Sequence, residues 1–435
     1  MPMERICIEH ATLVPLDPQQ PPVLRDASLV ICGGRIESVG AAAPPCGRVL
    51  DGSGWLVMPG LVNAHTHTPM TLLRGLKDDC TLSQWLEQYI WPAESSLTRD
   101  DFYWGAMLGI AELLAAGTTC VSDMYRASGA LLRAAADTGI KANICESITA
   151  EEPFVPAQHA GVQESLRTIG QWNGYDHGRI RCDTSIQSCW QTPPALWRYI
   201  GDMAAEHGIG IHIHLAETQS ELETCRTRYG DTPVRLLEKA GVFRNRVAAV
   251  HGIWLDETDQ HILKDHGAVI VHDPASNYKC CCGFANLRPY LEKGIPVALG
   301  TDGVCSNNSA DPFETMKTTA LVQKMLNSDP CLLPARQVLE MATQGGLASQ
   351  GRGGEAGMLR PGMDADLIAL DRTVPALHPG LSPESDLVYA ASGAMVRLTM
   401  VRGRILYENG RFPTIDIRRV YDEVEKIVRR ITPCR

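Results

Sequence analysis

Residues 57–67 read Val57-Met58-Pro59-Gly60-Leu61-Val62-Asn63-Ala64-His65-Thr66-His67. The apolar and β-branched residues that lead up to the histidines predict a short buried strand over Leu61–His65. Side chains alternate between the two faces of a strand, so residues two positions apart point the same way. We therefore expect His65 and His67 to leave the end of one strand side by side, as binding of a divalent metal requires. A His-x-His pair alone is weak evidence, because surface pairs of this kind are common.

Further apolar segments follow this one, and stretches rich in Ala, Leu and Glu separate most of them. The predicted strands are Leu61–His65, Thr118–Asp123, Ile140–Glu146, Ile180–Ile186, Ile209–His214, Val247–His251, Ala268–His272 and Pro296–Thr301. The predicted helices between them include Phe102–Ala116, Ser128–Thr138 and Thr232–Ala240. Eight alternating units predict an α/β fold of the (β/α)₈ TIM-like barrel type, whose active site lies at the C-terminal ends of the strands.

Segments typical of β structure flank the predicted barrel on both sides. Before it we expect strands at Ile6–Leu16, Ala27–Cys32 and Arg35–Val39, with a turn at Gly33-Gly34. After Gly357 we expect a strand at 367–371, a hairpin of Val396–Val401 with Gly403–Glu408, and a terminal helix over Asp416–Ile431. Each group of strands is too small to hold a core alone, so we predict that they pair into one small β-sandwich. The expected division is 1–58, 59–356 and 357–435.

Composition narrows the class of partner. The chain has 435 residues, of which 44% are apolar and 21% are charged, as is ordinary for a soluble globular protein. A formal net charge of -10 without any block of like charge argues against nucleic acid or an anionic membrane as the partner. No apolar run approaches the roughly 18 residues of a membrane span, and the N-terminus does not open a secretory signal. Fifteen cysteines without a Cys-x-x-Cys spacing indicate reduced thiols in a cytoplasmic enzyme.

Polar side chains stand at or just beyond the C-terminal ends of several predicted strands. His65 and His67 follow the first strand, His214 ends the fifth and Asp302 follows the eighth. One histidine on an apolar strand is commonly a buried core residue, but that explanation does not suit a whole set at one face. Three imidazoles and a carboxylate suit Zn²⁺, with Fe²⁺ as the alternative, and one position remains for water. His212 shares a strand face with His214, and we expect it one layer deeper as a structural residue.

Two further residues have the chemistry to move protons and stabilise charge. A bound metal lowers the pKa of its water to about 7, and a nearby group must take the proton and deliver it to the leaving group. Glu217, three residues beyond His214, is the candidate, because such a carboxyl group acts as both acid and base. His251, at the end of the sixth strand, would orient the water and stabilise developing negative charge. Asp302 would accept a proton from the water while it binds metal. The alternative for Glu217 is an ordinary surface ion pair.

Five segments resemble the amidohydrolase superfamily. They are Pro59-Gly60-Leu61-Val62-Asn63-Ala64-His65-Thr66-His67, His212-Ile213-His214-Leu215-Ala216-Glu217-Thr218, Val250-His251-Gly252-Ile253-Trp254-Leu255, Ser276-Asn277 and Gly300-Thr301-Asp302-Gly303. The likeness continues in Pro361-Gly362-Met363-Asp364-Ala365-Asp366-Leu367 and is greatest for the branch that holds methylthioadenosine and S-adenosylhomocysteine deaminases and triazine hydrolases. It implies a mononuclear zinc or iron hydrolase, built as a barrel with a β-sandwich. The implied ligands are His65, His67, His214 and Asp302, and the implied catalytic residues are Glu217 and His251. No lysine occupies the usual bridging position after the fourth strand, which agrees with a single metal ion.

The same resemblance suggests substrate-binding residues. Trp85 and Glu94 match the loop after the first strand, which in nucleoside deaminases packs on the base and bonds the ribose hydroxyls. Trp85 could equally be a core residue. Gln187 stands where nucleoside deaminases usually carry a histidine after the fourth strand, and it forms hydrogen bonds without carrying charge. Glu146 stands near the place of an arginine that binds the carboxylate of S-adenosylhomocysteine, which makes that compound a poor candidate. A purine, pterin, pyrimidine or triazine ring remains open.

Four cysteines lie in loops that we expect to surround the predicted pocket. Cys280, Cys281 and Cys282 are consecutive in the loop after the seventh strand, and Cys305 follows Asp302. They fit neither a zinc finger nor a disulfide ladder. The simplest interpretation is neutral, close-packed loop thiols, and a metal hydrolase needs no thiol nucleophile.

Three functions remain open at this point. The first is hydrolysis of an exocyclic C–N bond on an aromatic N-heterocycle, with release of ammonia. The second is displacement of halide or alkylamine from a triazine-type ring, which uses the same metal apparatus. The third is a non-catalytic binding homologue, which should have lost ligands or the acid–base residue, although all of these positions are filled here. The expected partner is a small heterocyclic substrate, and a homodimer is suggested by analogy alone.

Overall fold

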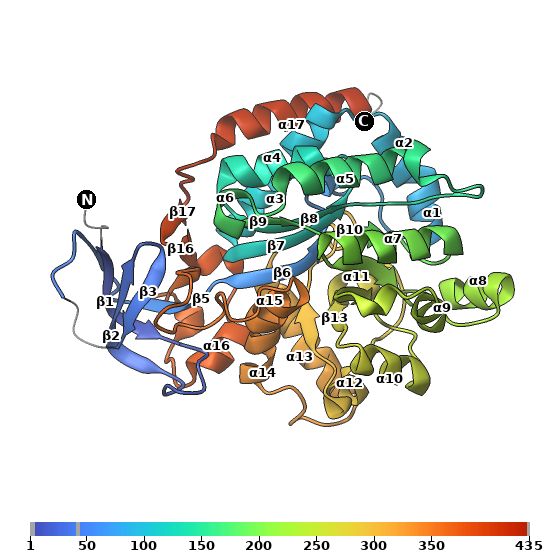
Figure 1. Cartoon of the computed structure of the whole chain (residues 1–435). Helices are drawn as coiled ribbons and strands as arrows, with labels where there is room; N and C mark the ends of the chain where they lie inside the picture. The colour runs from blue at the N-terminus through green and yellow to red at the C-terminus, as the bar shows by residue number, and fades with distance from the viewer. Residues whose placement is uncertain (1–4, 41–43, 433–435) are drawn as a thin grey trace.

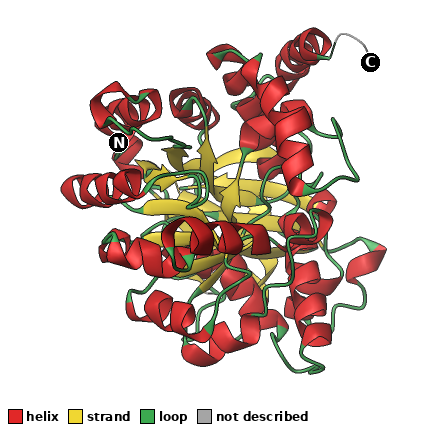
Figure 2. Ribbon diagram, turned by 90° about the vertical axis from the view of Figure 1, so that its right-hand side faces the viewer, coloured by secondary structure: helices red, strands yellow, loops and turns green. Residues whose placement is uncertain are grey.

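A closed barrel of parallel strands forms the centre of the molecule. The computed structural model describes residues 5–40 and 44–432. Strands lie inside and helices surround them (Figure 2). The barrel strands are β6 (Leu61–Thr66), β7 (Thr118–Tyr125), β8 (Lys141–Glu146), β9 (Ile180–Cys182), β10 (Thr184–Ile186), β11 (Ile211–Leu215), β12 (Val247–His251), β13 (Val269–His272) and β14 (Val297–Leu299). β9 and β10 are two halves of one predicted strand, interrupted at Asp183, so the prediction of eight barrel strands is confirmed.

Backbone hydrogen bonds join the two parallel sheets β6–β9 and β10–β14 into one barrel. At one junction the Asp183 N–H donates to the Ile144 carbonyl (3.3 Å). At the other, the N–H groups of Thr301 and Asp302 both donate to the His65 carbonyl at 3.1 Å. The second junction therefore places two predicted metal ligands, His65 and Asp302, side by side.

The strands from the two ends of the chain pair in a single eight-stranded sheet beside the barrel (Figure 1). Its members are β1 (Arg5–Leu13), β2 (Leu24–Cys32), β3 (Arg35–Val39), β4 (Arg48–Asp51), β5 (Trp55–Pro59), β15 (Leu367–Asp371), β16 (Val396–Val401) and β17 (Arg404–Glu408). The order is β17-β16-β15-β5-β1-β2-β3, with β4 also paired to β1. Leu29, Val57 and Leu367 belong to a small core of its own. The predicted pairing of the two terminal groups is confirmed, whereas the division into domains at residues 58/59 and 356/357 stays a prediction.

The stretch over residues 57–67 contributes to two strands: the predicted strand Leu61–His65 is β6, and β5, which precedes it, was not predicted. β5 ends at Pro59 and pairs with β15 in the small sheet, whereas β6 begins at Leu61 in the barrel. Gly60 lies at the crossing, where a Cβ atom would stand 2.2 Å from the Thr119 side chain. Only a residue without a side chain permits this close approach.

Helices cover the outside of the barrel. The longer ones are α3 (Arg99–Ala115), α4 (Ser128–Thr138), α5 (Ala160–Trp172), α7 (Pro194–His207), α8 (Gln219–Tyr229), α10 (Glu257–Asp265), α13 (Pro312–Leu326) and α17 (Ile417–Ile431). The shorter ones are α1 (Leu82–Trp85), α2 (Trp91–Ser95), α6 (Tyr175–Gly178), α9 (Pro233–Lys239), α11 (Pro274–Lys279), α12 (Leu287–Lys293), α14 (Ala335–Glu340), α15 (Gly346–Ser349) and α16 (Pro383–Tyr389). The predicted terminal helix is α17, and it packs on α3 (Figure 1). Within residues 5–40 and 44–432, none of the helices combines the length and apolar character needed to cross a bilayer.

One pair of cysteines departs from the expectation of reduced thiols. Cys7 and Cys46 are joined as a disulfide. The other cysteines that the structure describes are free, including Cys280, Cys281, Cys282 and Cys305. The composition alone could not identify this pair, because Cys7 and Cys46 are brought together only by the folding of the small sheet.

A buried ion pair connects the barrel to the small sheet. Lys141, at the start of β8, lies 2.9 Å from an oxygen of Asp364 and 2.5 Å from one of Asp366. All three side chains are nearly inaccessible to solvent. We predict that Lys141→Met lowers the free energy of unfolding by about 3–5 kcal/mol, because it leaves the buried Asp366 carboxylate without a cation and leaves Asp364 only the longer ion pairs with Arg402 (3.4 Å) and Arg35 (3.7 Å).

Urea denaturation checks this prediction. Lys426→Met is the matched control, because Lys426 is an exposed residue of α17 whose ion pair with Glu423 contributes about 1 kcal/mol or less. Equal stability of the two variants would contradict the structural role of Lys141.

Candidate functional site

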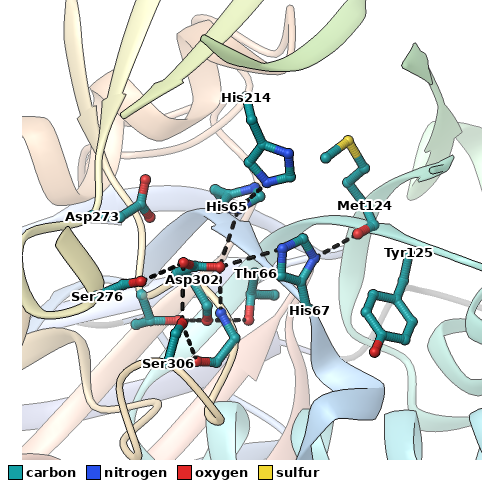
Figure 3. Close-up of polar contacts among 12 residues, drawn as sticks. His65, Thr66, His67, Met124, Tyr125, His214, Asp273, Ser276, Asp302 and Ser306 are labelled. Carbon is teal, nitrogen blue, oxygen red and sulfur yellow. Dashed lines mark hydrogen bonds and ion pairs between the residues drawn. The ribbon is translucent and has the colours of Figure 1, made fainter. Parts of the chain in front are cut away.

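Four predicted ligands meet at the C-terminal end of the barrel. His65 lies on β6 and His67 just beyond it, His214 lies on β11, and Asp302 follows β14 (Figure 3). The Nε2 atoms of His65 and His67 lie 3.4 and 3.3 Å from Oδ1 of Asp302. The Nε2 atoms of His65 and His214 are 3.3 Å apart. The structure thus brings together the whole predicted set, drawn from three different strand ends.

Each of these imidazoles is oriented by a hydrogen bond at its other ring nitrogen. Nδ1 of His67 donates to the Met124 carbonyl (2.6 Å), and Nδ1 of His214 donates to the Gln187 carbonyl (2.9 Å). Nδ1 of His65 is paired with Nε2 of His212 at 2.8 Å. His212 is buried beneath the cluster, in agreement with its expected deeper position. Such partners fix the ring and its tautomer, so that the Nε2 lone pairs face one another.

Burial keeps these imidazoles neutral at pH 7. It lowers the pKa of His65 to about 3, and it also lowers the pKa values of His67 and His214. The pKa of Asp302 is held well below its usual range: burial alone would raise it, but the His65 and His67 imidazoles beside the carboxylate outweigh burial. The cluster therefore consists of neutral nitrogen acceptors around an ionised carboxylate.

This donor set fits a divalent cation. Acceptor atoms at 3.3–3.4 Å from one another repel unless a positive charge lies among them. Two overlapping groups in the described part of the chain have the spacing for an ion: His65, His67 and Asp302, and His65, His214 and His251. Three nitrogens and one oxygen are ligands that zinc accepts readily.

Asp302 is held in place by its surroundings. Ser276 and Ser306 donate hydroxyl hydrogen bonds to Oδ2 at 2.6 and 3.1 Å, and the Gly303 N–H donates to Oδ1 at 2.7 Å (Figure 3). The Asp302 backbone has a φ of 58°, which is uncommon for a residue with a side chain. Such conformations persist only where surrounding contacts impose them, and they cluster at functional sites.

Glu217 and His251 lie next to the cluster. Oε2 of Glu217 is 3.8 Å from Nε2 of His251, whose Nδ1 donates to Oδ1 of Asn277 at 2.9 Å. Burial raises the pKa of the Glu217 carboxyl group above its usual value. A carboxyl group with a raised pKa exchanges a proton more readily near neutral pH, as an acid–base residue must. Asp273, also buried, lies 3.9 Å from Nδ1 of His251.

A cavity of about 1220 Å³ opens onto these groups. Its lining includes His67, His214, Glu217, His251 and Asp302. All three predicted substrate-binding residues also line it: Trp85, Glu94 and Gln187. The volume exceeds what a single heterocycle fills, so a ligand with a ring and a second group fits the cavity.

The substrate-side residues are tied to neighbours within the cavity wall. The Trp85 indole N–H donates to the Lys77 carbonyl at 3.1 Å, and its largely buried ring belongs to both the hydrophobic core and the cavity wall. Tyr125 donates to the buried carboxyl group of Glu94. Burial raises the pKa of that carboxyl group. The Ser147 hydroxyl donates to the side chain of Gln187.

Several residues of the site escaped sequence reasoning. Ser276 and Asn277 were recognised only as part of a motif, and Ser306 and Asp273 were not singled out. Arg126 lines the cavity next to Tyr125, and nothing in its local pattern distinguished it. Glu146 also lines the cavity, where its carboxylate accepts the N–H groups of Ala127 (3.1 Å) and Ser128 (2.7 Å). These contacts depend on which loops meet above the barrel.

Comparison with known proteins extends this picture. The model of the amidohydrolase family matches residues 56–406. The chain is 38% identical over 425 residues to 5'-deoxyadenosine deaminase of Methanosarcina mazei, and 38% identical over 429 residues to 5-methylthioadenosine/S-adenosylhomocysteine deaminase of Pelotomaculum thermopropionicum. Each alignment covers 98% of both chains.

Two crystal structures with bound zinc have the same fold. An adenosine deaminase from Xanthomonas campestris superposes with a TM-score of 0.93 at 29% identity, covering 98% of both chains. Atrazine chlorohydrolase from Arthrobacter aurescens superposes with a TM-score of 0.88 at 26% identity, covering 97% of this chain and 100% of the other. Because the family model spans most of the sequence and the relatives match almost its whole length, the chain belongs to the amidohydrolase family.

Proposed function

We propose that this protein is a zinc-dependent aminohydrolase that removes the exocyclic amine of an adenosine derivative as ammonia. The observation that carries the proposal is the convergence of His65, His67 and His214 on Asp302, at a cavity that also holds Glu217 and His251. Full-length relatives that are named as deaminases support the type of reaction.

One ion per chain would be held by His65, His67, His214 and Asp302, with Fe²⁺ as the alternative to Zn²⁺. Zinc in such a site lowers the pKa of water to about 7 and supplies a nucleophile at neutral pH. Asp302, whose Oδ2 is already satisfied by two serine hydroxyls, would offer Oδ1 to the ion and to a proton of the attacking water.

Glu217 would carry the protons. Deamination of adenine breaks the C6–N bond, forms a C–O bond from water, and requires protons on the ring nitrogen and on the departing amine. The carboxyl group of Glu217 faces the cavity and its pKa is raised by burial, so it can donate to the ring and then recover a proton from water. The products are the 6-oxo ring and ammonia.

His251 would orient the attacking water. Its Nδ1–H is committed to Asn277, which leaves Nε2 directed toward Glu217 and the cavity. In the neutral ring Nε2 is an acceptor and would orient the attacking water through one of its O–H groups. Once Nε2 has taken a proton, the ring would stabilise the negative charge that develops at the attacked carbon.

The cavity wall favours a nucleoside. The part of the Trp85 ring that lines the cavity would stack on the ligand, Glu94 would bond ribose hydroxyls, and Gln187 would offer a neutral hydrogen-bonding group. Glu146 would disfavour a second carboxylate at its own place in the wall, whereas Arg126 in the same wall would attract one.

A triazine-type hydrolase that displaces halide or alkylamine is the second candidate, and the likeness to atrazine chlorohydrolase favours it. The deaminase relatives are more similar in sequence, so we place this function second. A non-catalytic binding homologue is the least supported, because the acid–base and ligand positions are all filled. A cytoplasmic location and a homodimer stay predictions.

A substrate panel tests the proposed reaction. Zinc-loaded protein should release ammonia from 5'-deoxyadenosine and adenosine. S-adenosylhomocysteine, free guanine, a pterin and an aminotriazine complete the panel. Ammonia from none of these compounds, together with halide release from a chlorotriazine, would replace the proposal with the second candidate.

Replacement of the acid–base residue tests the mechanism. Glu217→Gln should lower kcat by about 10²–10⁴-fold, because the amide cannot exchange a proton, while zinc content stays at one equivalent. Exposed Glu223→Gln on α8 is the matched control. Turnover of Glu217→Gln near that of the unaltered protein would remove Glu217 from the mechanism.

Metal analysis tests the ligand set. Asp302→Ala should weaken zinc binding by at least about 100-fold, since loss even of an outer partner commonly costs 10–100-fold. Asp202→Ala, on the exposed side of α7, should retain full zinc. An Asp302→Ala variant that keeps one tightly bound zinc would show that the ligand assignment is wrong.

A further inference from the structure

The run Cys280-Cys281-Cys282 follows α11 directly, and the proposed reaction assigns it no part. The thiols differ in their surroundings: Cys281 is exposed, Cys280 is half-buried and Cys282 is buried. Of these three cysteines, as the structure describes them, only Cys282 contacts a proposed catalytic residue, Glu217. Its Sγ atom lies 3.5 Å from Oε1 of Glu217.

Glu217 is therefore held between two partners. Oε1 faces the Cys282 thiol at 3.5 Å, and Oε2 faces Nε2 of His251 at 3.8 Å. The Glu217 backbone N–H donates to Oε2 of Glu221 at 2.8 Å, which fixes the main chain but not the carboxyl group. Among the described residues, Cys282 is the only one whose side chain forms a hydrogen bond with the Glu217 carboxyl group.

The geometry suits a hydrogen-bond donor rather than a nucleophile. The adjacent Cys280 thiol and burial both raise the pKa of the Cys282 thiol, so it is protonated at neutral pH. A neutral thiol donates weakly, and a carboxylate is a strong acceptor. The other acceptors within reach both belong to Cys280: its sulfur, which is a weak acceptor, and its carbonyl, which is farther away at 3.9 Å.

The loop that carries Cys282 is anchored to the site. The Cys282 N–H donates to the Asn277 carbonyl at 2.9 Å, and the Trp254 indole N–H donates to the Cys282 carbonyl at 2.8 Å. Asn277 also accepts from His251. Cys282 and His251, which face the two oxygens of the Glu217 carboxyl group, are thus both hydrogen-bonded to Asn277 of α11. This shared partner fixes the distance between them.

We propose that Cys282 is a positioning residue for Glu217, whose thiol donates to Oε1 and so holds Oε2 toward His251 and the reacting ring. The inference rests on the proposed function, since it assigns Cys282 a part in the proton transfer attributed to Glu217. A carboxyl group without this partner rotates about its terminal bond and spends less time in the productive orientation.

Steady-state kinetics with 5'-deoxyadenosine and zinc-loaded protein test the role. Cys282→Ala removes the donor and should lower kcat by about tenfold, with KM within about twofold and zinc content unchanged. Cys282→Ser keeps a donor of similar size and should restore most of the lost kcat. Cys281→Ala, in the same loop but exposed, should match the unaltered protein.

The paired variants separate positioning from packing. A normal kcat in Cys282→Ala would overturn the proposal. Equal losses in the Ala and Ser variants would overturn it as well, because they would show that the sulfur volume matters rather than the donor.

Infrared spectroscopy gives a readout that needs no turnover. The S–H stretching band of Cys282, isolated as the difference between the unaltered protein and Cys282→Ser, should lie at lower frequency than the same difference recorded in a Glu217→Ala background. An unchanged band would overturn the hydrogen bond itself. If the panel of adenosine derivatives yields no ammonia, the proposed function is wrong. The infrared measurement still shows whether the Cys282 thiol donates a hydrogen bond to Glu217.

Discussion

The hydrogen bonds that Thr301 and Asp302 donate to the His65 carbonyl close the barrel, and the rest of the site depends on them. They bring the end of the last strand against the end of the first, which places the Asp302 carboxylate beside two imidazoles. Gly300 permits this approach, because a Cβ atom there would lie 2.9 Å from the backbone nitrogen and oxygen of His65. The same hydrogen bonds therefore close the barrel and bring the predicted ligands together.

The site gathers groups that are unfavourable together in the absence of a ligand. Neutral imidazoles and an ionised carboxylate present acceptor atoms to one another inside the barrel, and several backbones are strained there. Ala216, His251 and Asp302 all have positive φ values: His251 ends β12, Ala216 directly follows β11, and Asp302 lies three residues beyond β14. Functional sites commonly store such strain where the surrounding packing is firm enough to hold it.

The barrel and the ligand set could be predicted from the sequence, because both depend on local patterns. Alternating apolar segments located the barrel strands, and residues at the ends of parallel strands must meet at one face. The sequence predicted the strand over Leu61–His65 but not β5, the short strand just before Gly60 that belongs to the other sheet. It also assigned no disulfide to Cys7 and Cys46, whose contact arises from the small sheet.

The sequence by itself determined which strands carry the histidines, the side on which they emerge and the chemistry that they suit, because strand alternation and chain order are local properties. Only the tertiary structure decided how those groups are oriented. The carbonyls of Met124 and Gln187 fix two imidazoles, Asn277 fixes His251, and Cys282 reaches Glu217 across 65 positions of sequence. Such contacts join loops that follow different strands. They depend on tertiary packing, so local sequence patterns do not predict them.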